Sequence, residues 1–258
     1  MKRLHSMLVF FGVDFKKMFI SITGLFKYFR ELKKIKIQLN NYDLFKLGKK
    51  YPILNEWNDQ AGSSTGHYFH QDLFIAQLIF ENNPQQHIDV GSRIDGFVAH
   101  VAAYRKIKVL DIRDVKINSK NIEFIKSDLM NIQSSLINSV DSISSLHVLE
   151  HFGLGRYGDS IDYFGYLKGF SNITNILKKD GIFYFSVPIG LQRIEFNAHR
   201  VFSIKYLLEL IKPLYNIKSF SYVDDNDNFF INTILSEKCI IDNCGCSFGC
   251  GIFELIKK

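Results

Sequence analysis

Residues 87 to 100 read H-I-D-V-G-S-R-I-D-G-F-V-A-H. The stretch predicts a short apolar strand over 87–90, a polar loop that holds two glycines, and then a helix. Glycine lets a backbone approach a ligand closely, and the free N–H groups at the start of a helix bind anionic groups. This order is typical of nucleotide-binding α/β domains. Arg93 stands where such a tight loop usually has another small residue.

Strand-like segments alternate with helical patterns through the rest of the chain. Hydrophobic spacing predicts helices over 67–82, 97–105, 160–178 and 203–211. Strands are expected over 87–90, 108–112, 122–126, 140–149, 182–187 and 217–223, with a last one over 229–236 or near 251–256. The alternation predicts an α/β fold with a mostly parallel sheet and helices on both faces.

Polar residues at the ends of the first three predicted strands are the candidate cofactor ligands, because open α/β sheets bind ligands there. Asp111 ends the second strand, and its carboxylate can accept hydrogen bonds from two ribose hydroxyls. Asp128 follows the third strand, where it can meet an adenine amino group. A helix N-cap or turn role is the alternative for both aspartates. The first loop contributes Asp89, Gly91, Ser92, Arg93 and Gly96.

A series of motifs over residues 67 to 236 resembles the class I S-adenosylmethionine-dependent methyltransferases. The series is D-V-G-S, V-L-D, S-D-L, S-L-H-V-L-E-H and L-K-K-D-G-I-F-Y-F-S-V-P. Three longer stretches are more specific and resemble an uncharacterised bacterial domain-of-unknown-function family associated with surface-polysaccharide biosynthesis: H-I-D-V-G-S-R-I-D-G-F, H-V-L-E-H-F-G-L-G-R-Y-G-D and F-N-A-H-R-V-F-S. The resemblance implies a Rossmann-like class I methyltransferase fold, S-adenosylmethionine as cofactor, and a small-molecule or lipid-linked sugar as substrate.

The first loop departs from the usual methyltransferase pattern, which is acid-x-Gly-x-Gly-x-Gly. Arg93 replaces the second of these glycines, and the last one comes later, at Gly96. The Arg93 guanidinium can crowd the methionine carboxylate or pair with it, since guanidinium binds carboxylate bidentately. It equally suits a ligand that carries phosphate.

Methyl transfer to a hydroxyl needs a base that removes the proton of the acceptor. His151 directly follows the fourth predicted strand, and its unperturbed pKa suits a base near neutral pH. Glu150 beside it is expected to orient a histidine or bind cofactor. His199 is a second candidate base, and Arg200 can bind an acidic sugar or phosphate. His147 lies inside the predicted strand and is interpreted as a core histidine.

Residues 152 to 159, F-G-L-G-R-Y-G-D, predict a flexible loop on the acceptor side of the site. Arg156 supplies charge for a sugar acid or phosphate, and the Tyr157 ring suits the apolar face of a pyranose. A plain surface loop is the alternative interpretation of this segment.

Residues 1–38 form a basic, aromatic-rich stretch, which predicts an amphipathic helical extension to a methyltransferase-like domain over 39–258. Lysines interrupt every apolar run before it reaches the roughly 20 residues of a membrane span. Peripheral contact with an anionic membrane is one interpretation, and a helix that covers the domain or a dimer partner is the other. We expect a cytoplasmic protein, at the inner face of the membrane in the first case.

The net charge of +6 is concentrated in this extension, and no DNA- or RNA-binding motif follows it, so no nucleic-acid partner is expected. The four cysteines have the spacing C-x4-C-x-C-x3-C, which differs from the paired C-x2-C units of zinc sites. We predict reduced thiols, no disulfide and no metal. The acidic run over 224–227 is interpreted as a solvated turn.

Three functions fit these patterns. The first is an S-adenosylmethionine-dependent O- or N-methyltransferase that acts on a sugar of a surface glycan or its carrier. The second is a methyltransferase-shaped binding protein in glycan assembly that no longer uses the cofactor. The third is an enzyme that uses a nucleotide sugar in the same cleft. The sequence indicates no oligomeric state.

Overall fold

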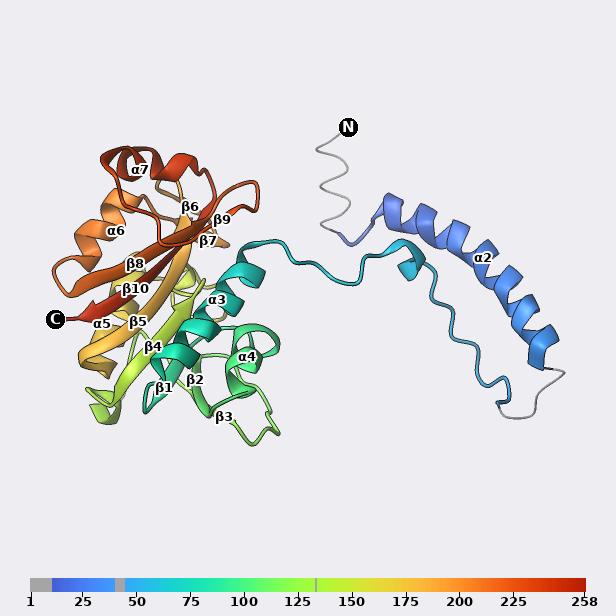
Figure 1. Ribbon diagram of the computed structural model, residues 1–258, viewed down its shortest axis with the longest axis horizontal. Coiled ribbons are helices and arrows are strands. Elements are labelled where there is room, and N and C mark those ends of the chain that lie inside the picture. The colour runs from blue at the N-terminus through green and yellow to red at the C-terminus, as the bar shows by residue number, and fades with distance from the viewer. Residues whose placement is uncertain (1–10, 40–44, 133) are drawn as a thin grey trace. The chain divides into compact units, whose positions relative to one another are not determined.

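Figure 1 shows the computed structural model, which describes residues 11–39, 45–132 and 134–258. The chain divides into two compact units, Met1–Ser63 and Ser64–Lys258. The first unit includes residues 39–63, which the sequence analysis assigned to the second domain. The first ten residues of the predicted extension lie outside the described residues.

The first unit contains helix α2 (Phe15–Leu39) and the short 3₁₀ helix η1 (Glu56–Asn58). Gly24 lies against the Leu54 carbonyl, where an added Cβ would come within 1.8 Å of the oxygen, so this close approach requires glycine. The Lys27 ammonium sits 4.3 Å from the centre of the Trp57 ring. Among the described residues, no helix has the length and apolar character needed to cross a membrane.

The second unit is built on one sheet with the strand order β3-β2-β1-β4-β5-β10-β8-β9. Strands β1 to β5 pair in parallel, whereas β10 runs antiparallel between β5 and β8. The strands are β1 (His87–Val90), β2 (Ile107–Asp111), β3 (Ile122–Lys126), β4 (Val140–Leu146), β5 (Leu177–Ile189), β8 (Tyr215–Val223), β9 (Phe229–Phe230) and β10 (Gly249–Lys257). A separate hairpin pairs β6 (Arg193–Glu195) with β7 (His199–Val201).

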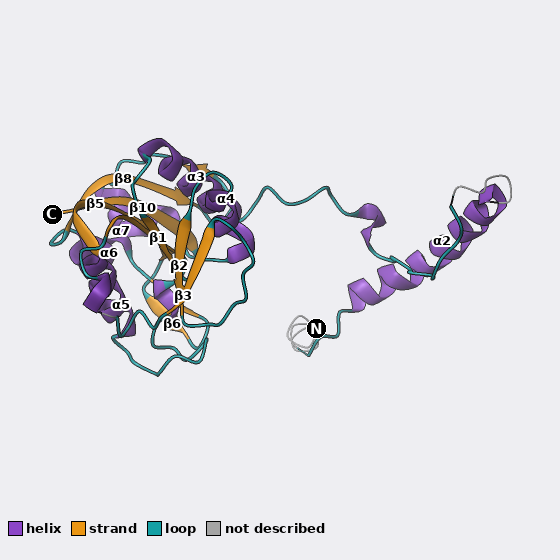
Figure 2. Ribbon diagram, turned by 90° about the horizontal axis from the view of Figure 1, so that it is seen from below, coloured by secondary structure: helices purple, strands orange, loops and turns teal. Residues whose placement is uncertain are grey.

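Helices cover both faces of this sheet, as Figures 1 and 2 show. Helices α3 (His67–Asn82) and α4 (Ala99–Ala102) share one apolar core with the sheet, which includes Ile75, Val101 and Val109. Helices α5 (Gly165–Ile176) and α6 (Ile204–Ile211) share the other core, which includes Phe170 and Leu207. Helix α7 (Glu237–Asp242) and the turns η2 (Ile94–Val98), η3 (Ser134–Leu136), η4 (Leu149–His151) and η5 (Asn243–Gly245) complete the described elements. The predicted α/β fold is confirmed.

Several predicted element boundaries were wrong. The helix after the first loop begins as the π-helical turn η2 and ends at Ala102, before the predicted position 105. Strand β4 ends at Leu146 because His147 has a positive φ of 54°. The L-K-K-D-G segment belongs to β5, whose register with β4 shifts there, and does not close a helix. Of the two predictions for the last strand, 251–256 lies within β10, while only Phe229 and Phe230 of 229–236 form a strand.

The prediction that all cysteines are reduced thiols was wrong. Cys239 and Cys244 form a disulfide, with Cα atoms 4.1 Å apart. Helix α7 ends at Asp242, and Asn243 with φ of 56° turns the chain back, which brings Cys244 beside Cys239. Cys246 and Cys250 are free and buried.

Candidate functional site

A cavity of about 380 Å³ opens where β1, β2, β3 and β4 end. Its position is the edge at which open α/β sheets bind ligands. The predicted site residues that line it are Gly91, Ser92, Arg93, Asp111, Asp128, His151, Arg156 and Tyr157. The structure does not place the remaining predicted residues in its lining, namely Asp89, Gly96, Glu150, His199 and Arg200.

Gly91 turns the chain out of β1 into the cavity wall. Its φ is +70°, and an added Cβ would lie 2.7 Å from Cγ1 of Val148, so both the backbone and the neighbouring side chain require glycine. The Gly91 N–H donates to the Leu110 carbonyl at 2.8 Å, which ties the loop to the end of β2.

The Asp89 side chain holds this loop in place through hydrogen bonds to Ser92. Its fully buried carboxylate accepts hydrogen bonds from the Ser92 N–H at 3.0 Å, the Ser92 hydroxyl at 2.7 Å and the Ser144 hydroxyl at 2.6 Å. Burial raises the pKa of Asp89 to about 6, against the opposing effect of these hydrogen bonds. Its oxygens therefore shape the loop, which is a different role from the predicted cofactor contact.

Arg93 does not crowd the loop with its guanidinium. The side chain pairs with Asp95, with Nε–Oδ1 and Nη2–Oδ2 distances of 3.1 and 2.9 Å. It is 61% exposed. Gly96 lies behind the loop, where an added Cβ would come within 2.8 Å of Oδ2 of Asp72. The unusual arginine thus sits at the rim of the cavity and is held by a neighbour in sequence.

Asp111 ends β2 at the cavity, as predicted, but a second residue holds its carboxylate. Arg113 donates to Oδ1 through its backbone N–H at 2.8 Å and Nε at 3.0 Å, and to Oδ2 through Nη2 at 2.5 Å. The same guanidinium donates to the Gly91 carbonyl at 3.3 Å and lies 4.5 Å from the centre of the Tyr157 ring. Arg113 was not among the predicted site residues, although a basic residue two positions after the acid at a strand end is a signal that the sequence carries.

Asp128 lines the cavity and also makes the turn that was its alternative interpretation. Its Oδ1 accepts from the Met130 N–H, and its Oδ2 accepts from the Asn131 amide, each at 2.9 Å. A carboxylate has about four lone-pair sites, so both oxygens keep acceptor capacity toward a ligand.

Glu150 lies behind the cavity between two histidines. Nδ1 of His147 is 2.9 Å from its Oε1, and Nε2 of His151 is 3.8 Å from the same oxygen. Burial raises the pKa of Glu150, but the hydrogen bond and charge of His147 outweigh burial and hold that pKa below its usual range. Burial likewise opposes protonation of His147, yet Cys250 and Glu150 raise its pKa well above the ordinary value. His147, interpreted from sequence as a core residue, is buried and also borders the cavity.

His151 has a fixed orientation at the cavity wall. Its Nδ1 lies 2.7 Å from the Ala198 carbonyl, which only accepts hydrogen bonds, so Nδ1 carries the proton. Burial lowers the pKa of His151, which keeps the ring neutral at pH 7 and leaves a lone pair on Nε2. Arg156 donates to the same carbonyl at 2.9 Å, and the His151 and Tyr157 rings meet edge to face at 5.5 Å.

His199 and Arg200 lie outside the cavity lining. Nε2 of His199 is 3.0 Å from Oε2 of Glu195 on the paired strand, and its ring packs on Phe248 at 4.9 Å. Arg200 is 4% exposed. Its guanidinium donates to the carbonyls of Glu150, Phe152, Asp162 and Tyr163 at 2.6 to 3.4 Å. Arg200 therefore holds the loop after β4 in place, and its donors are engaged with backbone.

The central part of the chain matches the model of a known protein family. A family model described as Caenorhabditis protein of unknown function, DUF268, matches residues 98–243, which is more than half of the 258 residues. The chain belongs to this family. A search of curated proteins found no match.

Solved structures share the fold at low sequence identity. The [4+2]-cyclase SpnF has a TM-score of 0.51 and 12% identity, over 76% of this chain and 85% of that chain. The 1,6-didemethyltoxoflavin-N1-methyltransferase of Burkholderia thailandensis, solved with S-adenosylhomocysteine, has a TM-score of 0.48 and 12% identity, over 78% and 80%. The N-methyltransferase NodS of Bradyrhizobium japonicum, also with S-adenosylhomocysteine, has a TM-score of 0.48 and 9% identity, over 78% and 89%. The second unit has the Rossmann-like class I methyltransferase fold.

Proposed function

We propose that the second unit is an S-adenosylmethionine-dependent methyltransferase that modifies a sugar of a surface glycan or its lipid-linked carrier. One observation carries the proposal. A single cavity contains the glycine loop, the strand-end carboxylate of Asp111 and a neutral histidine, His151, whose free nitrogen is fixed by the Ala198 carbonyl.

The cavity residues fit the cofactor. Gly91 presents backbone without a side chain, and Arg93 is turned toward Asp95, so the loop leaves room for a ligand. Asp111 would accept from the ribose hydroxyls, and Asp128 from the adenine amino group. S-adenosylmethionine supplies an electrophilic methyl group when bound.

The chemistry that the chain itself supplies is proton removal and acceptor binding. Nε2 of His151 accepts the proton of an acceptor hydroxyl as the new bond forms, while the Ala198 carbonyl keeps the ring oriented. The Tyr157 ring offers a surface for the apolar face of a sugar, and Arg156 can bind a nearby acidic group. Both line the same cavity as His151, which supports a sugar as acceptor.

A nucleotide sugar is the second candidate ligand. The guanidinium carbons of Arg113 and Arg156 lie 4.5 and 5.2 Å from the centre of the Tyr157 ring. Arg113 is paired with Asp111, so Arg156 is the cation that would bind an anionic group such as a diphosphate beside this ring.

The test is calorimetric titration of the full chain with S-adenosylhomocysteine, S-adenosylmethionine and a panel of nucleotide sugars. We expect S-adenosylhomocysteine to bind, and Asp111→Ala to weaken binding by about 10-fold or more, because hydrogen bonds to a charged group contribute about 1.5–3 kcal/mol. The matched control is Asp114→Ala, which removes a nearby exposed carboxylate that pairs with Lys126 at 3.4 Å.

Equal affinity in Asp111→Ala would remove the ribose assignment. Binding of a nucleotide sugar without S-adenosylhomocysteine would favour the second candidate. Binding of neither, by a chain whose circular dichroism shows a folded domain, would support a binding protein that has kept the fold without its cofactor.

A further inference from the structure

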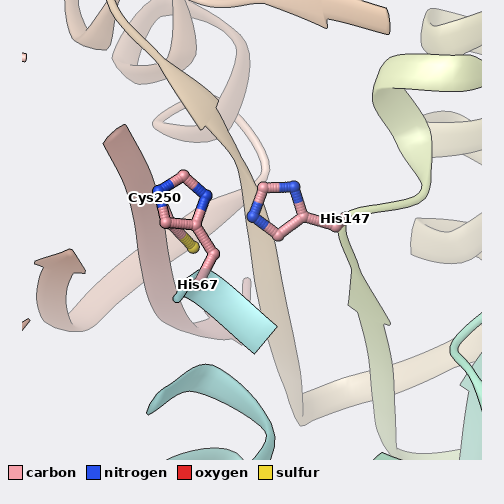
Figure 3. A group of neighbouring side chains, drawn as sticks. All are labelled: His67, His147 and Cys250. Carbon is pink, nitrogen blue, oxygen red and sulfur yellow. The ribbon is translucent and has the colours of Figure 1, made fainter. Parts of the chain in front are cut away.

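Three side chains that take no part in the proposed reaction lie close to one another. His67 is the first residue of α3, His147 follows β4, and Cys250 lies in β10. Each offers one ligand atom, and these atoms all lie within 4.8 Å of one another. Figure 3 shows the two imidazole rings side by side, with the Cys250 sulfur next to the His67 ring. The three residues are far apart in sequence, and only the fold brings them together.

His147 is oriented as a metal-binding histidine. Its Nδ1 donates to Oε1 of Glu150 at 2.9 Å, so Nε2 is the nitrogen available to a metal, which displaces the Nε2 proton when it binds. That Nε2 is buried and has no hydrogen-bond partner among the described residues. Metal-ligating histidines usually donate their other N–H to a carboxylate in this way, because the contact fixes the tautomer and strengthens the ligand.

The other two ligands are held by different elements. Cys250 is fully buried, and its strand pairs on both sides, with Pro188 of β5 and Val223 of β8. Its thiol donates to Oε1 of Gln71 at 3.6 Å. The half-buried His67 ring stacks between His147 at 5.4 Å and Phe248 at 5.7 Å.

We propose that His67, His147 and Cys250 bind a zinc ion at the edge of the cavity. Two imidazoles and a thiolate suit Zn²⁺, whereas Mg²⁺ and Ca²⁺ prefer oxygen ligands. Ligand atoms on a tetrahedral zinc lie roughly 3.3–3.6 Å apart, given Zn–N and Zn–S bonds of about 2.0 and 2.3 Å. The side chains reach this spacing by closing about 1 Å.

Three protein ligands leave the fourth zinc position for water or substrate, whereas structural zinc sites are usually closed by four. Since His147 also lines the cavity, the proposed ion lies beside the ligand that the cavity takes. The zinc site does not depend on the proposed methyl transfer. The prediction of no metal was based on the spacing of the four cysteines, which differs from that of zinc motifs, and it took no account of the histidines.

The test uses Co²⁺ as a coloured substitute for Zn²⁺ on the full chain, under argon and without added thiol so that the Cys239–Cys244 disulfide stays intact. We expect one Co²⁺ per chain with a thiolate-to-cobalt charge-transfer band, which Zn²⁺ removes and Mg²⁺ does not. Cys250→Ser should abolish the band. The matched control is Cys246→Ser, which removes the other free buried cysteine and should keep it.

Two further variants cover the case in which Cys250→Ser does not fold. His67→Ala, at the half-buried start of α3, should weaken Co²⁺ binding at least as strongly as Glu150→Gln, which removes the supporting carboxylate and should cost about 10–100-fold in affinity. Absence of Co²⁺ binding by the wild-type chain would overturn the proposal. A charge-transfer band that survives in His67→Ala but disappears in Cys246→Ser would also overturn it, because it would assign the metal to the C-terminal cysteines.

Discussion

His151 and His199 carry the same side chain, yet their surroundings give them different chemistry. The Ala198 carbonyl holds Nδ1 of His151 at 2.7 Å and leaves Nε2 at the cavity wall. Nε2 of His199 instead faces Glu195 at 3.0 Å, outside the cavity lining. A base needs an unengaged lone pair near the acceptor, so His151 is the better candidate.

The pH dependence of methyl transfer tests this assignment. His151 acts as a base only when neutral, and burial lowers its pKa below 6.5. The rate should therefore stay constant from pH 8 down to about 6.5 and fall only at lower pH. His151→Gln should reduce kcat by about 10²–10⁴-fold and leave S-adenosylhomocysteine affinity unchanged.

The measurement is the transfer of labelled methyl groups to an acceptor that supports turnover, with His199→Gln as the control that keeps the wild-type profile. A profile with the same acid limb in His151→Gln would assign the base to another residue.

The sequence alone could predict which residues line the cavity where their position at the end of a strand decides this. Gly91 and Asp111 lie at the ends of predicted strands, and the loop with Arg156 and Tyr157 follows another. The parallel sheet brings these strand ends together at one cavity. Arg200 was not predictable in the same way, because its role depends on carbonyls far away in the sequence. Arg113 was missed although its partner Asp111 is only two residues away, whereas the position of His147 beside His67 and Cys250 depends on residues far away in the sequence.

Helix α2 carries an exposed apolar stripe. Its residues recur at intervals of three and four and are Phe15, Met18, Phe19, Ile22, Phe26 and Phe29. Lysines and Arg30 occupy much of the remaining surface of the helix. This combination supports the proposal that the first unit contacts an anionic membrane surface.

Vesicle flotation tests the membrane proposal. We expect the full chain to float with vesicles that contain anionic lipid, and less so at high salt, because part of the attraction is electrostatic. Phe19→Glu combined with Phe26→Glu should reduce binding by about 100-fold or more, since burying each phenylalanine contributes about 1.5–3 kcal/mol. Phe45→Glu is the matched control, because Phe45 is 82% exposed and lies outside α2. Flotation that is equal in both variants would favour a helix that packs against protein.

Elements were predictable where local pattern and tertiary structure agree. The predictions for α3, β1 and β3 match the observed bounds, and the Asn83-Pro84 pair directly after α3 is a local signal that ends a helix. The early start of β5 depends on its pairing with β4 and β10, which no local pattern encodes.

Buried ionisable groups make the stability of the whole molecule depend on pH. His87 is 2% exposed, and its ring nitrogens lie 2.8 and 3.1 Å from the hydroxyls of Ser142 and Ser144. Burial lowers its pKa to about 3. The unfolded chain binds a proton on His87 below about pH 6.5, whereas the folded chain does not until about pH 3. Stability from His87 is therefore complete above pH 6.5 and falls as the pH drops.

Chemical denaturation at two pH values measures this effect. The slope is about 1.4 kcal/mol per pH unit, so His87 should cost about 2 kcal/mol between pH 6.5 and 5. Asp89 acts in the opposite direction, because its raised pKa of about 6 makes the folded chain bind a proton first. The informative quantity is thus the difference between wild type and His87→Gln, in which the variant should lose about 2 kcal/mol less. Equal losses in both proteins would show that His87 does not cause the acid sensitivity.

The position of β10 has a consequence for how the protein is made. Every other strand of the sheet precedes β10 in the chain, yet β10 lies between β5 and β8. Until β10 is available, no strand lies between β5 and β8, so the edge of each that faces the gap lacks its partner. Exposed strand edges pair readily with other chains, so the nascent protein passes through an aggregation-prone stage. That stage ends only when residues up to Lys257 have left the exit tunnel and closed the gap.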